Sequence, residues 1–176
     1  MDIRECYRLC VSDYNRYVEH SEVKSGNMMM IWNALTTWNH RCAFSFWLRM
    51  GRCDNFVIRI ISKAYYFRLS RKFGLQVPFA TEIGEGLYIG HGIGIIINPK
   101  TKIGKNCNIS QFTTIGNNKG IGAEIGENVY IGPNVCIVED VKIGNNVKIG
   151  AGTVVVHNVP ENCTSVGNPN RIIVKK

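Results

Sequence analysis

The sequence predicts a mainly β fold, a solenoid of short parallel strands, preceded by an α-helical region. Two observations support this prediction. Apolar residues recur at helical spacing over the first part of the chain. From Val77 onward they recur every six residues, usually with glycine directly after the aliphatic residue. A short fixed period is typical of solenoids, in which each coil buries its apolar face against its neighbours. We therefore divide the chain into a helical region, residues 1–74, and a solenoid, residues 75–176.

Three stretches of the helical region are expected to be helical. Residues 3–18 carry apolar side chains at i, i+3, i+4 and i+7, the spacing of one helix face. Residues 32–51 follow, with an interruption expected near Thr36. Asp54 is a candidate N-cap for the last helix, and Gly74 is its candidate left-handed stop.

Two inward-facing positions define each repeat of the solenoid. The first is aliphatic and occurs at Val77, Ile83, Ile89, Ile97, Ile103, Ile109, Ile115, Ile125, Ile131, Ile137, Ile143, Ile149 and Val155. The second lies four residues later and is small or branched, at Thr81, Leu87, Ile93, Thr101, Cys107, Thr113, Val129, Val135, Val141, Val147, Thr153 and Val159. Two shifts interrupt the frame: two residues are added within 89–97, and four are added between Ile115 and Ile125. The segment NNKGIGAE at the second shift is expected to loop out.

A histidine, His91, stands in the apolar stretch LYIGHGIGIII. The repeat places Ile89 and Ile93 inward, and we expect His91, between them, to face outward. The glycines on either side leave room for a ligand. The other histidines, His20, His40 and His157, are interpreted as structural or incidental.

Composition excludes several classes of protein. Hydrophobic content of 45% and charged content of 19% describe an ordinary folded protein. No apolar run approaches the roughly 20 residues of a membrane span, and the start MDIRECYRLC does not resemble a signal peptide. We therefore expect a cytoplasmic protein. The seven cysteines are odd in number and include no CxxC pair, which favours reduced, mostly buried thiols over disulfides or a metal site.

The net charge of +8 is unevenly distributed. Between Arg41 and Lys72 there are eight basic residues and one acid, Asp54. Such a segment could attract a membrane surface, a nucleic acid or a phosphorylated substrate, or it could be a solvated helical face. No RNA-binding motif accompanies it, so we expect no nucleic-acid partner. Peripheral membrane contact stays open.

The repeat resembles the hexapeptide motif of the left-handed β-helix acyltransferases. More closely, residues 77–110 (VPFATEIGEGLYIGHGIGIIINPKTKIGKNCNIS), with VKIGAGTVV and VGNPNRII further on, resemble the serine acetyltransferase branch. Similar sequences occur among O-acetyltransferases of surface-polysaccharide clusters. The resemblance implies a left-handed β-helix, although the usual crossover rule predicts the opposite hand. It also implies homotrimers, with pairing of trimers left open, and acetyl-CoA as cosubstrate.

The resemblance also assigns roles to residues. His91 matches the general base that deprotonates the acceptor hydroxyl, for which imidazole is the best-suited side chain. Gln76 is a candidate for orienting it, with Glu82 or a backbone carbonyl as alternatives. The positions that match acetyl-CoA contacts are Gly116, Gly132, Pro133, Lys148 and Ala151, and weaker phosphate contacts are Lys119 and Arg171.

The sequence departs from serine acetyltransferases in several places. Aspartates of that family align with Gly90 and Gln76, and the loop at residues 117–124 lacks the second histidine and its arginine. An amino-acid acceptor needs counter-charges for its two charged ends, so these departures favour a sugar hydroxyl. We therefore expect an acetyl-CoA-dependent O-acetyltransferase of surface-polysaccharide biosynthesis. The alternatives are serine O-acetyltransferase of cysteine biosynthesis and a non-catalytic hexapeptide scaffold or membrane adaptor.

Overall fold

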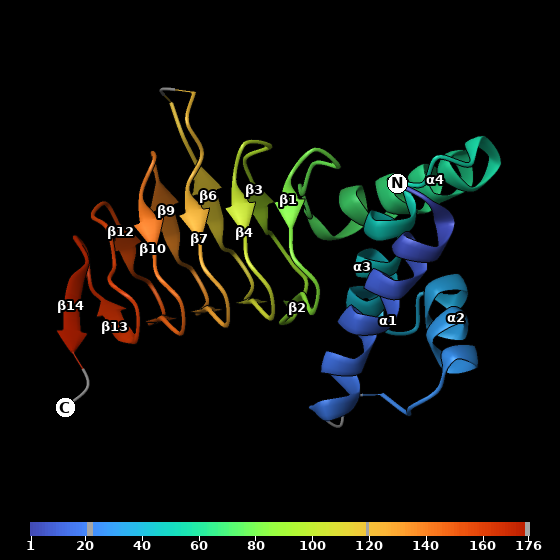
Figure 1. The fold of residues 1–176 in the computed structure, drawn as a ribbon, viewed down its shortest axis with the longest axis horizontal. Helices are drawn as coiled ribbons and strands as arrows, with labels where there is room; N and C mark the ends of the chain where they lie inside the picture. Colours follow the sequence, from blue (N-terminus) through green and yellow to red (C-terminus); the bar gives the residue numbers. More distant parts are fainter. Residues whose placement is uncertain (21–22, 119, 175–176) are drawn as a thin grey trace.

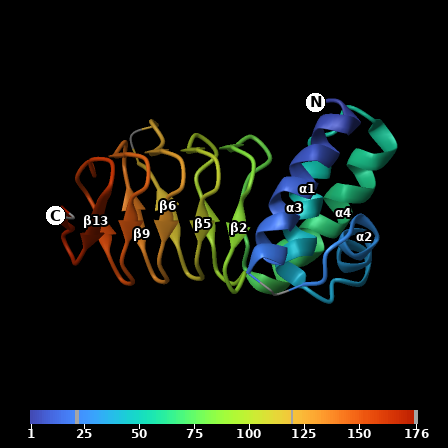
Figure 2. The same ribbon diagram turned by 60° about the horizontal axis from the view of Figure 1, so that its bottom comes forward.

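The computed structural model describes residues 1–20, 23–118 and 120–174. Within them, four helices form one end of an elongated molecule, and a three-sided parallel β-solenoid forms the remainder (Figures 1 and 2). The predicted fold is thus confirmed. The helices are α1 (Ile3–Glu19), α2 (Asn27–Thr36), α3 (His40–Met50) and α4 (Phe56–Phe73). None of the helices in the described residues has the length and apolar character needed to cross a membrane.

Three sheets of two- to four-residue strands form the sides of the solenoid. The first sheet contains β1 (Glu82–Ile83), β4 (Lys102–Ile103), β7 (Glu124–Ile125) and β10 (Lys142–Ile143). The second contains β2 (Tyr88–Ile89), β5 (Asn108–Ile109), β8 (Tyr130–Ile131), β11 (Lys148–Ile149), β13 (Cys163–Val166) and the antiparallel β14 (Arg171–Val174). The third contains β3 (Ile96–Ile97), β6 (Thr114–Gly116), β9 (Cys136–Val138) and β12 (Val154–Val155).

The six-residue period produces this shape because every coil stacks on the next in register. Ile83 pairs with Ile103, which pairs with Ile125, so aliphatic residues form columns inside the solenoid. All of the first inward series is buried except Ile83, which is half-buried in the first strand of its sheet. Glycine follows these aliphatics where neighbouring coils approach closely: a Cβ on Gly104 would lie 2.5 Å from the carbonyl oxygen of Gly126.

The first frame shift corrects one prediction. Ile93 is 43% exposed, whereas Ile95 is 1% exposed and takes the inward position two residues before Ile97. The two added residues widen the corner between β2 and β3, so the frame restarts at Ile95 and the prediction for Ile93 was wrong. The second shift falls where it was expected, between β6 and β7.

The helix boundaries refine the sequence interpretation. The interruption near Thr36 is confirmed, because Thr37 adopts a left-handed conformation (φ 55°) between α2 and α3. The N-cap of α4 is Asn55, whose side chain accepts a hydrogen bond from the Ile58 amide at 3.1 Å. The prediction of Asp54 was therefore wrong by one residue: its carboxylate pairs with the N-terminal ammonium of Met1 at 2.5 Å.

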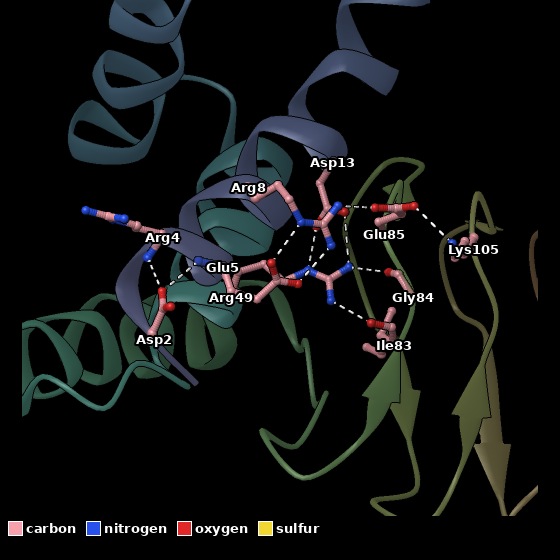
Figure 3. Close-up of polar contacts among 10 residues, drawn as sticks. All are labelled: Asp2, Arg4, Glu5, Arg8, Asp13, Arg49, Ile83, Gly84, Glu85 and Lys105. Carbon is pink, nitrogen blue, oxygen red and sulfur yellow. Dashed lines mark hydrogen bonds and ion pairs between the residues drawn. The ribbon is translucent and has the colours of Figure 1, made fainter.

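A buried ion pair joins the helices to the first coil (Figure 3). Arg49 of α3 donates from Nε to Asp13 of α1 at 2.8 Å, and both side chains are almost fully buried. The guanidinium also donates to the carbonyl oxygens of Ile83 and Gly84, and the Asp13 carboxylate accepts from the Leu87 amide at 2.8 Å. These bonds fix the helical region on the corner between β1 and β2.

The cysteines are free thiols, as the sequence predicted. Six are buried and Cys136 is half-buried. Burial raises the pKa of Cys6 and of Cys107 to about 11, which keeps both thiols protonated at neutral pH. No cluster of three or more His, Cys, Asp or Glu side chains in the described residues could hold a metal ion.

Candidate active site

His91 lies in the widened corner formed by residues 90–95 between β2 and β3. It is exposed, as predicted, but alternation along a strand is not the reason, since alternation would place residue 91 on the same face as the buried Ile89. The backbone of His91 adopts the left-handed conformation (φ 59°), which is uncommon for a residue with a side chain. This local turn directs the imidazole out of the coil.

Backbone hydrogen bonds on both sides hold the corner. On the side of the second coil, Gly90 donates to the Ile109 carbonyl at 2.8 Å, and Phe112 donates to the Ile93 carbonyl at 3.0 Å. On the other side, Gly94 donates to the carbonyl of Phe73, the last residue of α4, at 2.9 Å. The His91 backbone is therefore held between the solenoid and the helical region.

Two side chains of α3 pack against the corner. A Cβ on Gly92 would lie 2.6 Å from Cγ of Arg41 and 3.1 Å from Nε2 of His40, so only glycine fits there. The His40 ring stacks on Phe73 with centroids 4.1 Å apart. Burial lowers the pKa of His40, and the nearby backbone of His91 and Gly92 offsets part of this effect. Sequence reasoning did not find these contacts, because no periodic signal connects α3 with residue 91.

Exposed apolar side chains lie beside the candidate base. Ile93, Ile96 and Phe112 are each more than two fifths exposed. A Cβ on Gly94 would lie 2.6 Å from Cδ1 of Phe112, so the Phe112 ring covers the corner from the next coil. Phe112 was not singled out in the sequence. The signal that could have found it is its place in the repeat, because it follows a strand of the second sheet just as His91 does.

Gln76 lies next to β3 rather than in the corner itself. Its amide donates to the Ile95 carbonyl at 2.7 Å, and its carbonyl accepts from the Ile97 amide at 2.8 Å. Its side chain is exposed. Within the part of the chain that the structure describes, no hydrogen bond joins the side chains of Gln76 and His91.

Three of the residues matched to acetyl-CoA contacts lie along the same edge as His91, in later coils. Gly132 and Pro133 follow β8, and Ala151 follows β11, at the corner between the second and third sheets. Hydrogen bonds connect these turns, as from the Gly152 amide to the Pro133 carbonyl at 2.9 Å. Parallel strands lie about 4.8 Å apart, so three coils separate His91 from Ala151 by about 14 Å.

The other matched residues lie in different places. Lys148 is exposed on β11, on the side of the second sheet, and Arg171 is exposed at the start of β14. Gly116 ends β6, at the other edge of the third sheet, and a Cβ on it would meet open space. Lys119 lies outside the described residues. This edge thus contains His91, Gly132, Pro133 and Ala151, but not Gly116.

An exposed imidazole on an edge of small residues can act on a bound hydroxyl. A neutral imidazole can accept the proton of a hydroxyl group, and the exposed position of His91 leaves it accessible to a substrate.

Comparisons with known proteins agree with the fold. Residues 122–157 match the family described as "Bacterial transferase hexapeptide (six repeats)". The serine acetyltransferase of Bacillus pumilus (strain SAFR-032) is 34% identical over 143 residues, covering 78% of this chain and 62% of the relative. The serine acetyltransferase of Bacillus subtilis (strain 168) is 33% identical with the same coverage. The chain therefore spans about three fifths of the length of these curated relatives.

Solved structures show the same architecture. Soybean serine acetyltransferase complexed with serine has a TM-score of 0.69 and 28% identity, with 96% of this chain and 69% of that chain covered. Serine acetyltransferase from Brucella abortus strain S19 has a TM-score of 0.79 over 98% of this chain and 70% of that chain; at 22% identity it supports the fold alone. By its repeats, its fold and these relatives, the chain belongs to the hexapeptide-repeat proteins of the serine acetyltransferase-like type.

Proposed function

We propose that this chain is an acetyl-CoA-dependent O-acetyltransferase in which His91 is the general base. The acceptor hydroxyl oxygen attacks the thioester carbonyl carbon while Nε2 or Nδ1 of His91 removes the hydroxyl proton. When the tetrahedral intermediate collapses, the C–S bond breaks and the imidazolium returns the proton to the departing thiolate. The products are the acetyl ester and free CoA. The observation that carries this proposal is the exposed His91 on an edge of small residues.

Serine is the acceptor that the relatives favour. The curated relatives above are named serine acetyltransferases, and the soybean neighbour is a complex with serine. The comparisons thus favour the alternative that the sequence analysis ranked second.

A sugar hydroxyl is the second candidate. Gly90 and Gln76 occupy positions at which the serine acetyltransferases carry aspartates. The site therefore has fewer negative charges to bind the ammonium group of an amino acid. A neutral sugar needs no such charges. A scan of serine and a panel of sugars as acceptors, with CoA thiol release as the readout, distinguishes the two. Six buried thiols and one half-buried thiol keep the protein's own background low in this assay.

The His91→Asn variant tests the role of His91. Asparagine tolerates the left-handed backbone at residue 91 but cannot serve as a base, so the corner is retained while catalysis is lost. We expect turnover to fall by about 10²–10⁴-fold. His157→Asn, at another exposed histidine of the solenoid, is the matched control and should keep full activity. Wild-type turnover in His91→Asn would refute the assignment.

We also propose a homotrimer. The His91 edge carries the exposed apolar residues Ile93, Ile96 and Phe112, and a neighbouring subunit packed there would enclose the acetyl-CoA path. Three chains of 19.8 kDa give about 59 kDa, and paired trimers would give twice that mass. Light scattering on the eluting protein measures this directly, and a mass near 20 kDa would exclude the trimer.

A further inference from the structure

The outward face of α4 is apolar, which is unusual for a surface helix. The residues turned inward are Ser62, Tyr66 and Leu69. The exposed ones include large hydrophobic side chains at Phe56, Val57, Ile60, Ile61 and Phe67. Surface helices of folded proteins normally place such residues against the core and polar residues outward. An exposed apolar patch of this kind is typical of an interaction surface.

Two exposed tryptophans, Trp32 of α2 and Trp38 in the connection from α2 to α3, lie in the same helical region. Trp32 is 60% exposed and Trp38 is 87% exposed, and both line an apolar hollow of about 420 Å³. The buried Trp47 lies between α2 and α4, donating from Nε1 to the Ala34 carbonyl and stacking on Tyr65 with centroids 4.5 Å apart. Figures 1 and 2 show α2 in the helical end of the molecule, whereas α4 runs from that end to the first coil, where its last residue, Phe73, accepts a hydrogen bond from Gly94. We use the name distal surface for the exposed apolar side chains of this region, namely Trp32, Trp38, Phe56, Val57, Ile60, Ile61 and Phe67.

The positive charge of α4 indicates what kind of partner binds the distal surface. Helix α4 carries five basic residues and no acid, and Arg68 and Arg71 are exposed beside its apolar face. The nearby acid, Asp54, is paired with the N-terminal ammonium of Met1. A second copy of the chain would bring basic helix against basic helix with no acids to meet them. A lipid surface supplies both an apolar layer for the hydrophobic residues and phosphates for the arginines.

We propose that the distal surface docks on an anionic lipid bilayer. The apolar side chains of α4, with Trp32 and Trp38, enter the headgroup region, while Arg68 and Arg71 meet lipid phosphates. Tryptophan favours this interface because its ring is apolar and its N–H is polar. The proposal goes beyond acetyl transfer and holds whichever acceptor the enzyme uses.

Vesicle sedimentation of the full chain tests this docking. We expect binding to vesicles of phosphatidylcholine with about one third phosphatidylglycerol, and at least about tenfold weaker binding to pure phosphatidylcholine. Salt at about 1 M should reduce binding, because the Debye length then falls to about 3 Å. Emission from Trp32 and Trp38 should shift to the blue with the acidic vesicles, whereas the buried Trp47 reports no change of environment.

Two pairs of variants separate specific docking from bulk charge. Arg68→Glu with Arg71→Glu should weaken vesicle binding at least about tenfold. The control, Lys100→Glu with Lys102→Glu, makes the same change of charge at exposed solenoid positions and should bind as the wild type does. Because all four side chains are exposed, the folded state should tolerate each variant, and circular dichroism checks this.

A third variant tests the apolar contribution. Phe56→Ser with Ile60→Ser keeps every charge and alters only exposed positions, so weaker vesicle binding is again expected. The proposal is overturned if the wild type does not bind acidic vesicles. It is equally overturned if the Arg68/Arg71 variant and the Lys100/Lys102 variant lose the same amount of vesicle binding. It is also overturned if the serine variant lowers the oligomeric mass while no protein binds vesicles, because the distal surface would then join copies of this chain.

Discussion

At the residue scale, the backbone conformation of single residues decides where the chemistry lies. His91 faces outward because the widened corner places it in a left-handed turn, and the same corner turns Ile93 outward. Simple strand alternation accounts for neither orientation, because it would place residues 91 and 93 on the same face as the buried Ile89. His40 packs against this corner from the helical region. Its ring stacks on Phe73 and lies next to Gly92.

The position of His40 predicts a pH dependence of stability. Burial lowers its pKa below the ordinary value of 6.5, and Arg41 and Lys72 add to this effect. As pH falls through 6.5, the unfolded chain therefore takes up a proton at residue 40 before the folded chain does. The stability present above pH 6.5 is lost below it. We expect the melting temperature to fall between pH 7.5 and 5.5.

The substitution His40→Phe isolates this contribution. Phenylalanine retains a ring to stack on Phe73 but has no proton to gain, so its melting temperature should fall less over the same pH interval. His157→Phe, at an exposed position, should follow the wild type. If all three proteins show the same pH profile, His40 has no part in the acid response.

At the element scale, asparagine ladders support the turns that the six-residue period leaves between strands. Asn128 donates to Asn146 at 3.1 Å, and Asn146 donates to Asn162 at 3.0 Å, each from a residue with positive φ. Asparagine is one of the few residues other than glycine that tolerate this conformation. The strands were predictable because each side chain in the repeat faces its equivalent in the next coil. The turn conformations follow from asparagine and glycine at the corners.

Asn146 offers a test of this explanation. Asn146→Ala keeps a Cβ in a left-handed backbone and loses both ladder bonds, so we expect destabilisation by about 1–2 kcal/mol. Asn146→Gly loses the same bonds but removes the conformational strain, so its loss should be smaller. Urea denaturation followed by circular dichroism measures the difference. A glycine variant no more stable than the alanine variant would show that the backbone at this turn carries no strain.

At the scale of the whole molecule, sequence periodicity predicted the solenoid far better than the docking of the helices. The repeat constrains nearly every residue after Val77, and its one error, at Ile93, lies where residues were added. The contacts of His40 and Arg41 with the His91 corner join residues about fifty positions apart and follow no period. Their position depends on how α3 packs on α1 and α4, which spacing within one helix does not specify.

Two ion pairs formed by α1, one exposed and one buried, allow the effect of burial on stability to be compared (Figure 3). Arg8 pairs with Glu85 of the first coil at an exposed site, whereas Asp13 pairs with the fully buried Arg49. Arg8→Gln should cost less than about 1 kcal/mol, because water screens exposed pairs. Asp13→Asn leaves the Arg49 charge buried without its partner and should cost about 3–5 kcal/mol.

Limited proteolysis extends this comparison from stability to architecture. The Asp13 carboxylate and the Arg49 guanidinium also hold backbone groups of the first coil, so Asp13→Asn should loosen the helical region from the solenoid. Cleavage should then accelerate between α4 and β1 in Asp13→Asn and remain slow in Arg8→Gln. If the two variants lose similar stability and are cleaved at similar rates, the buried pair is not what joins the two parts. In that case the apolar contacts around Leu75 and Val77, both buried at this junction, hold the helices on the solenoid.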